Sequence, residues 1–238
     1  MKYVVAASYV IGALERHYGK GAKYLEMPKI KDVLPGLSEH PDMGIFMLGR
    51  AIVAEPTIHD TMYKYYESEL ENGKFVLKRG ARLLEKSYPK DIAYNCVVVG
   101  NYLIHHRQAD EVIINLCMEM GYEMVAVKQG YAKCSTLVVD NQSVITDDVG
   151  LAGIYRDMEI DTLLVQKGDV LLEGFEYGFI GGTAGRDEAN QCILFSGDLR
   201  NHRDGSAIRA FIEERGFEVV ELCDGPLIDC GSIFISKF

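Results

Sequence analysis

The sequence lacks the features that mark several large classes of protein. No stretch reaches the roughly 18 consecutive apolar residues of a membrane span, and no Lys- or Arg-rich run is present. Acidic residues outnumber basic ones by 35 to 25, which gives a formal net charge of -10 at pH 7. We therefore expect neither a membrane nor a nucleic acid as a partner.

The cysteines lack the spacing of a metal site or of a redox motif. None of the six stands in a CxxC pair, no Cys/His cluster has zinc spacing, and their density is below that of a secreted disulfide scaffold. The apolar stretch 4–14 is a poor signal peptide, because one charge precedes it and polar residues interrupt it. We expect reduced thiols, a cytoplasmic location, and no metal or other cofactor.

The sequence does contain enough apolar material for a globular core. Hydrophobic residues make up 48% of the chain and charged residues 25%, which excludes disorder. A chain of 238 residues can bury roughly 70% of its unfolded surface without disulfides. Length alone allows one large domain or two small ones.

Four segments share the layout of an apolar strand, a short turn and a second apolar strand. Each has Gly or Asp-Asn at its turn, where a positive φ is easiest, so each is predicted to be a β-hairpin. The segments are MGIFMLGRAIVA from Met43, CVVVGNYLIHH from Cys96, CSTLVVDNQSVIT from Cys134 and VLLEGFEYGFIGG from Val170. We expect an additional helix in 80–91 and a long loop in 181–203.

A helical stretch and a further short strand follow each hairpin, so the chain repeats one unit four times. The two ends supply a fifth unit if the last strand, from Gly231, pairs with the first, MKYVVAA. Such pairing closes a ring of five units and leaves no exposed sheet edge. The prediction is an α/β fold in one domain, 1–238, and the alternative is an ordinary α+β sandwich.

Five-fold repetition predicts that the residues before each hairpin meet on the axis of the ring. Polar residues at these positions need a reason, because an unsatisfied buried polar group costs roughly 1–3 kcal/mol. The positions are those of Asp42, Asn95, Cys134 with Ser135, Asp169 and Cys230. We therefore expect a polar site in the central channel.

This arrangement resembles the pentein fold, the five-bladed pseudo-symmetric β/α-propeller of the guanidino-group-modifying enzymes. DGPLIDCGSIFISKF, from Asp224, is similar to the end of dimethylarginine dimethylaminohydrolases, which implies that Cys230 stands at the nucleophile's position. GDVLLEG, from Gly168, is similar to the stretch whose Asp binds the substrate guanidinium, which implies that role for Asp169. Four motifs, GYAKCS, SVITDD, GFIGGTAG and DCGS, make the whole chain similar to an uncharacterised bacterial family with this fold.

The chain also departs from the pattern of these enzymes. The stretch VQKGDV carries no His where they place a catalytic His, and the neutral Tyr94-Asn95 replaces an acidic ligand. His40, two residues before Asp42, is the candidate general base in its place. Arginine deimination therefore does not follow from the resemblance.

Two functions from different classes remain open at this point. In the first, Cys230 is the nucleophile of a hydrolase or transferase, His40 its base, and Asp42, Asn95, Cys134, Ser135 and Asp169 shape a pocket for a small guanidino- or amidino-type cation. In the second, Cys230 is a small buried hydrophobic residue and the chain is a non-catalytic scaffold or ligand-binding protein. The oligomeric state is open in both.

Overall fold

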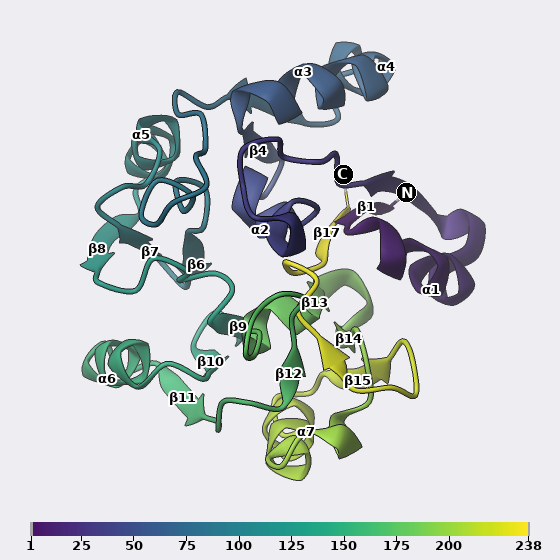
Figure 1. The fold of residues 1–238 in the computed structure, drawn as a ribbon, viewed down its shortest axis with the longest axis vertical. Helices are drawn as coiled ribbons and strands as arrows, with labels where there is room; N and C mark the ends of the chain where they lie inside the picture. The colour runs from purple at the N-terminus through teal and green to yellow at the C-terminus, as the bar shows by residue number, and fades with distance from the viewer. Residues whose placement is uncertain (1, 238) are drawn as a thin grey trace.

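Five three-stranded sheets with the same internal order make up most of the molecule, whose computed structural model describes residues 2–237. In each sheet the middle strand is antiparallel to one neighbour and parallel to the other. A helix always connects the middle strand to its parallel neighbour. This layout is the predicted repeat, and the connecting helices lie at the periphery of the molecule (Figure 1).

The first three sheets in this series follow one another along the chain. They are β3 (Ile45–Leu48), β4 (Ala51–Ala54) and β5 (Val76–Arg79); β6 (Val97–Val99), β7 (Tyr102–His106) and β8 (Glu123–Val127); and β9 (Thr136–Asp140), β10 (Ser143–Thr146) and β11 (Asp161–Leu164). Their helices are α3 (Pro56–Tyr65) with α4 (Glu67–Glu71), α5 (Glu111–Glu119) and α6 (Val149–Asp157). The three predicted hairpins here are confirmed.

The fifth unit is built from both ends of the chain, as predicted. Strand β17 (Phe234–Lys237) pairs antiparallel with β1 (Lys2–Ala6), which pairs in parallel with β2 (Ala22–Glu26) across helix α1 (Ser8–Tyr18). The two termini consequently lie beside each other in Figure 1. The sheets stay separate, since no strand pairing within 2–237 joins one of the five to the next.

The fourth hairpin lies elsewhere than predicted. Val170–Leu171 (β12) pairs in parallel with Leu227–Ile228 (β16) and forms no hairpin. The hairpin of this unit is β13 (Ala184–Asp187) with β14 (Cys192–Phe195), inside the segment expected to be a long loop, and β15 (Glu218–Glu221) and α7 (Gly205–Glu213) complete it. Its turn uses Gln191 at positive φ (51°), a conformation for which Gln is an unusual choice, so the turn signal is weak.

The predicted additional helix in 80–91 is also wrong. No helix is present between Gly80 and Asn95; the backbone there is held by side chains. Asp110 Oδ2 accepts hydrogen bonds from the Ala81 and Arg82 amides, and the Tyr94 hydroxyl donates to the Arg82 carbonyl. Such bonds satisfy backbone groups that a helix would otherwise pair.

Each helix covers its sheet with a buried apolar face. In α7, Ile208 and Ile212 are buried in one cluster with Phe195 of β14, and each such side chain contributes roughly 1.5–3 kcal/mol of hydrophobic stabilisation. In α1, Leu14 is buried in a second cluster that also includes Cys230. Within 2–237 no helix is long and apolar enough to span a membrane.

Candidate functional site

The residues that precede the first strand of each sheet form a closed series of hydrogen bonds, which we call the axial ring. Asn95 Nδ2 donates to the Asp42 carbonyl at 3.1 Å, and Asn95 Oδ1 accepts from the Cys134 amide at 3.2 Å. The Gly182 amide donates to the Cys134 carbonyl at 2.9 Å, and the Gly182 carbonyl accepts from the Cys230 amide at 3.0 Å. The Asp42 amide completes the ring by donating to the carbonyl of Gly231, the residue after Cys230, at 3.0 Å.

The axial ring brings together Asp42, Asn95, Cys134 and Cys230, as predicted, but not Asp169. Because the fourth hairpin is shifted, Gly182 takes the position expected for Asp169. Asp169 instead forms a bidentate ion pair with Arg203, with contacts of 2.7 and 2.8 Å, and this pairing lowers its pKa. Ser135 is buried beside Cys134, and its hydroxyl has no hydrogen-bond partner in the structure.

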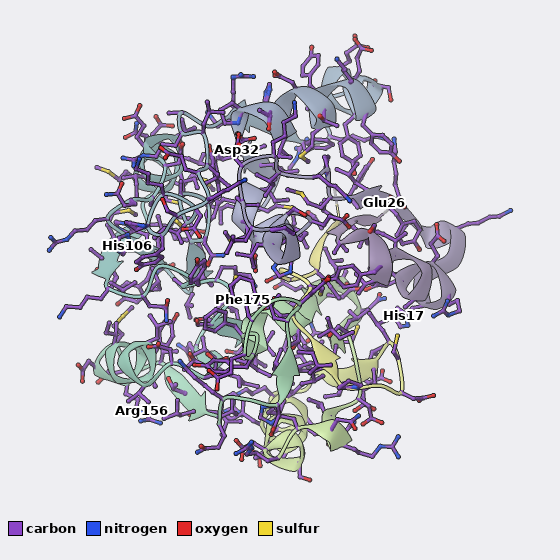
Figure 2. All side chains as sticks on the ribbon, viewed as in Figure 1. His17, Glu26, Asp32, His106, Arg156 and Phe175 are labelled. Carbon is purple, nitrogen blue, oxygen red and sulfur yellow. The ribbon has the colours of Figure 1, made fainter. Side chains whose placement is uncertain are left out.

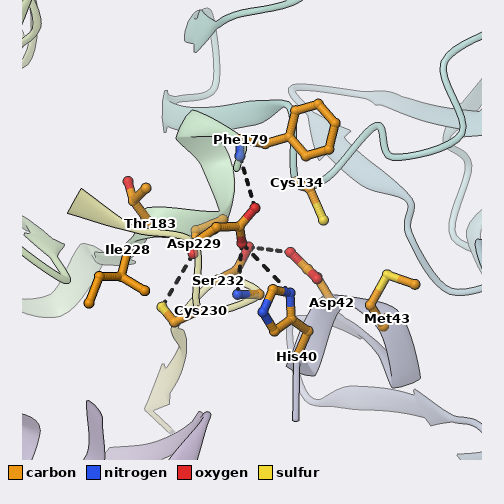
Figure 3. Close-up of polar contacts among 12 residues, drawn as sticks. His40, Asp42, Met43, Cys134, Phe179, Thr183, Ile228, Asp229, Cys230 and Ser232 are labelled. Atoms are coloured by element: carbon orange, nitrogen blue, oxygen red, sulfur yellow. Dashed lines mark hydrogen bonds and ion pairs between the residues drawn. The ribbon is translucent and has the colours of Figure 1, made fainter. Parts of the chain in front are cut away.

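Three ionisable side chains, His40, Asp42 and Asp229, are buried against the axial ring (Figure 3). Together with the half-buried Lys133, which contacts Ser232 beside them, we call them the polar cluster. Lys133 Nζ donates to Ser232 Oγ at 2.8 Å, and Ser232 Oγ lies 2.8 Å from Asp42 Oδ2, to which it donates. Lys133 is thereby connected to Asp42 through one hydroxyl group. Sequence reasoning singled out His40 and Asp42 but not Lys133 or Asp229 as parts of a binding site.

Asp229 is anchored by backbone amides. Its Oδ2 accepts a hydrogen bond from the Phe179 amide at 2.9 Å and its Oδ1 accepts one from the Gly231 amide at 3.0 Å. His40 Nδ1 lies 3.7 Å from Asp229 Oδ1, which is too long for a hydrogen bond, and both ring nitrogens of His40 are buried without a hydrogen-bond partner. Each carboxylate oxygen therefore keeps acceptor capacity for a further donor.

Burial dominates the titration of the polar cluster. It raises the pKa of Asp229 to about 6 and also raises the pKa of Asp42, where nearby Asp229 adds to the effect and His40 opposes it. Burial lowers the pKa of His40 and of Lys133, while Asp42 opposes both shifts. Burial therefore favours the neutral form of each of these four groups, and His40 is neutral at pH 7.

Cys230 is placed as a core residue. It is fully buried in the apolar cluster with Leu14 and Leu194, and its Sγ donates to the Gly182 carbonyl at 3.2 Å. Burial and then Asp229 raise its pKa well above the usual range of a thiol. Figure 3 shows its side chain on the side of Asp229 that faces away from Cys134 and Phe179. This environment favours the thiol over the thiolate.

Cys134 borders a cavity of about 280 Å³, which we call the aromatic pocket. Its walls carry four aromatic side chains, Tyr131, Phe175, Tyr177 and Phe179, and the Tyr131 and Phe179 rings lie 5.8 Å apart. Phe175 lies near the middle of the molecule in Figure 2. The other apolar side chains that line the aromatic pocket are Leu37, Met43 and Leu172, and its two carboxylates belong to Asp229 and Glu176.

Two further cavities border the polar cluster. One, of about 590 Å³, is lined by His40, Tyr9 and Asp229, so Asp229 lies between it and the aromatic pocket. The other, of about 600 Å³, is lined by Lys133 and by strands β13 and β17.

Cys134, next to Lys133, has a pKa that burial and then Asp42 raise well above its usual value. Within 2–237 no three His, Cys, Asp or Glu side chains are grouped to hold a metal ion.

Comparison with solved structures identifies the type of fold. A cysteine-to-serine variant of DDAH from Pseudomonas aeruginosa, complexed with citrulline, aligns with a TM-score of 0.53 at 11% identity, over 92% of this chain and 91% of that chain. The amidinotransferase SxtG from Microseira wollei aligns with a TM-score of 0.53 at 10% identity, over 90% and 74% of the two chains. Agmatine deiminase from C. jejuni aligns with a TM-score of 0.52 at 8% identity, over 93% and 87%. The chain therefore has the fold of these enzymes, in agreement with the resemblance stated from the sequence.

Comparison of the sequence assigns the family. No curated protein matches the sequence significantly. The model of DUF6873, a family of unknown function, matches residues 9–234, and the chain belongs to this family.

Proposed function

We propose that the protein binds a small organic cation of the guanidinium or amidinium type, without a covalent step, at Asp229 in the aromatic pocket. The observation that carries the proposal is the state of Asp229, a carboxylate that is 1% exposed yet lines a cavity. Its described partners are two backbone amides, and its one neighbouring imidazole, His40, is neutral at pH 7. A guanidinium fork supplies both the charge and the donors that such a carboxylate accepts.

The balance of buried charge supports a cationic ligand. Lys133 donates a hydrogen bond to Ser232, which donates to Asp42. The side chain of Lys133 is therefore connected to Asp42 and not to Asp229 by hydrogen bonds. Asp229, with a pKa raised to about 6, is ionised at pH 7, and its described hydrogen-bond donors are two backbone amides. Buried charges are stable when paired, and a cation in the pocket pairs this one.

The walls of the aromatic pocket support the same ligand class. Cations are attracted to the faces of aromatic rings, with roughly 0.5–2 kcal/mol per contact depending on desolvation. Tyr131, Phe175, Tyr177 and Phe179 line the same cavity as Asp229. A cavity of about 280 Å³ lies near the lower end of the usual size range for small-molecule sites, so the ligand is small.

Titration calorimetry with N-butylguanidinium tests the proposal. We expect Asp229→Asn to weaken binding roughly 10- to 100-fold, because a charge-assisted hydrogen-bonded pair is lost. We also expect the affinity for wild-type protein to fall about tenfold for each pH unit below 6, since Asp229 has its pKa raised to about 6 and its protonated form carries no charge.

Two further variants keep this test informative. Phe179→Leu preserves an apolar wall and removes a ring, so a loss of roughly three- to fivefold is expected even if Asp229→Asn does not fold. Asp169→Asn removes a half-buried carboxylate outside the pocket and is the matched control. Unchanged affinity in the Asp229 variant, or a loss in the Asp169 variant, would contradict the proposed site.

The catalytic hypothesis, in which Cys230 attacks an amidine or guanidinium carbon, stays a prediction with its own test. It requires a thiolate, whereas the Cys230 thiol donates to the Gly182 carbonyl in an apolar cluster. Incubation with chloroacetamidine followed by peptide mapping separates the two hypotheses. We expect the exposed Cys223 to be labelled and Cys230 to stay unlabelled in the native protein; labelling of Cys230 at the rate of Cys223 would favour catalysis.

We further propose that the five sheets are the blades of a five-bladed propeller and that residues 1–238 form a single domain. The identical strand order of the five sheets, the β1–β17 pairing and the closed axial ring support this interpretation. One cooperative unfolding transition, seen alike by different probes, is its expected signature.

A further inference from the structure

The aromatic pocket carries charged groups of one sign only. Asp229 and Glu176 are the charged members of its lining within 2–237, and Glu176 is an exposed residue whereas Asp229 is buried. The pocket thus has one carboxylate next to the axial ring and a second where the chain meets solvent. The lining, as far as the structure describes it, includes no Lys, Arg or His.

Two cations close to the pocket are already engaged. Lys133 lines a different cavity and donates to Ser232. Lys167 Nζ lies 5.9 Å from the centre of the Phe179 ring and 3.9 Å from Asp148 Oδ2, so an acidic partner accompanies its charge. His40 borders the neighbouring cavity and its pKa is lowered by burial, which keeps it neutral. None of the three is placed in the aromatic pocket to receive an anionic group.

We infer that the ligand of the aromatic pocket is a cation at both ends and carries no carboxylate. This inference rests on the proposed function and deepens it. A ligand with a guanidinium or amidinium group at Asp229 and an amine toward Glu176 meets an opposite charge at each end. A free amino acid of the same length would bring a carboxylate between two carboxylates and four aromatic walls, where repulsion and desolvation both oppose it.

Three probes of graded charge test the inference by titration calorimetry at pH 7.5 and low ionic strength. N-butylguanidinium has one cationic end and 4-aminobutylguanidinium has two. Arginine also has two cationic groups and carries a carboxylate beside its amine. We expect 4-aminobutylguanidinium to bind roughly fivefold more tightly than N-butylguanidinium, and arginine to bind at least about tenfold more weakly than 4-aminobutylguanidinium.

The variant Glu176→Gln tests whether Glu176 binds the amine end of the ligand. It is expected to abolish the tighter binding of 4-aminobutylguanidinium relative to N-butylguanidinium and to leave the affinity for N-butylguanidinium unchanged. The neighbouring Glu173→Gln is the matched control, because Glu173 is also exposed but lines the other cavity. Salt at about 0.5 M is expected to reduce the difference in affinity between 4-aminobutylguanidinium and N-butylguanidinium in wild-type protein as well.

The outcomes separate this inference from the proposed function. If N-butylguanidinium binds but arginine binds as tightly as 4-aminobutylguanidinium, the inference is overturned and the cation site stands. If Glu176→Gln weakens all three probes alike, the second end is misassigned and the inference is likewise overturned. If none of the three binds to wild-type protein, the proposed function fails and the inference fails with it.

Discussion

Replacing Gly231 with alanine is expected to destabilise the protein by about 3–4 kcal/mol. Gly231 has φ of +69°, where an L side chain costs roughly 1–2 kcal/mol. A Cβ atom there would also lie 2.2 Å from His40 Cβ, and relieving such an overlap in a packed interior costs roughly 1–3 kcal/mol. Since the Gly231 carbonyl accepts from the Asp42 amide, the displacement opens the axial ring.

Gly216→Ala is the matched control for this experiment. Gly216 has φ of +78°, but an added Cβ would have no atom within 4 Å. We expect this variant to lose only about 1 kcal/mol, measured by urea unfolding monitored by fluorescence and circular dichroism. Equal losses in the two variants would show that the approach of His40 to Gly231 is not a tight contact in solution.

Replacing Lys133 with methionine is expected to cost about 2–3 kcal/mol at pH 8 and much less at pH 5. The change removes the cation connected to Asp42 through Ser232 and its attraction for Asp229, and removing one partner of buried charges is strongly destabilising. Both carboxyl groups have pKa values that burial raises, so both take up protons as the pH falls. Protonation removes the unpaired charge, and the loss of stability shrinks as the pH falls through about 6.

Two comparisons isolate the buried charge as the cause. Lys90→Met removes an exposed lysine whose partner, Glu85, is also exposed, and should cost less than about 1 kcal/mol at either pH. The double variant Lys133→Met with Asp42→Asn should recover part of the stability at pH 8, because one buried carboxylate is gone. A loss for Lys133→Met that is the same at pH 5 and pH 8 would indicate lost packing and not lost charge.

The repeat was predictable because the first three hairpins each consist of two apolar strands around a turn that contains Gly or Asp-Asn. The fourth hairpin was not, because Arg186 and Asp187 interrupt the apolar pattern of β13 and its turn uses Gln191. The more apolar segment 170–182 fitted the hairpin pattern better, yet Gly181 and Gly182 are needed there because other atoms pack closely against their backbone. A Cβ on Gly182 would lie 1.9 Å from Asp229 Oδ1, and one on Gly181 would lie 2.5 Å from the Thr136 backbone.

The candidate site was predictable only where the axial ring uses side chains. Asp42 and Asn95 stand out as polar residues before apolar strands, but Gly182 contributes its backbone amide and carbonyl, which a search for polar side chains does not detect. Asp229 was not singled out from the sequence as part of a binding site. Its connection to the Phe179 amide, 50 positions away in the chain, depends on tertiary packing and leaves no local signal.

Because β1 pairs with β17, the first and last strands of the chain are neighbours in one sheet, as two consecutive strands would be. In register, Lys2 faces Lys237 and Val5 faces Phe234, so the first and last strands already form the equivalent of a hairpin that has no turn. A peptide linker across this gap and a new opening at another turn, such as Asn141–Gln142 between β9 and β10, would preserve every strand pair. The same molecule is thus compatible with circularly permuted sequences whose termini fall in a different three-stranded sheet.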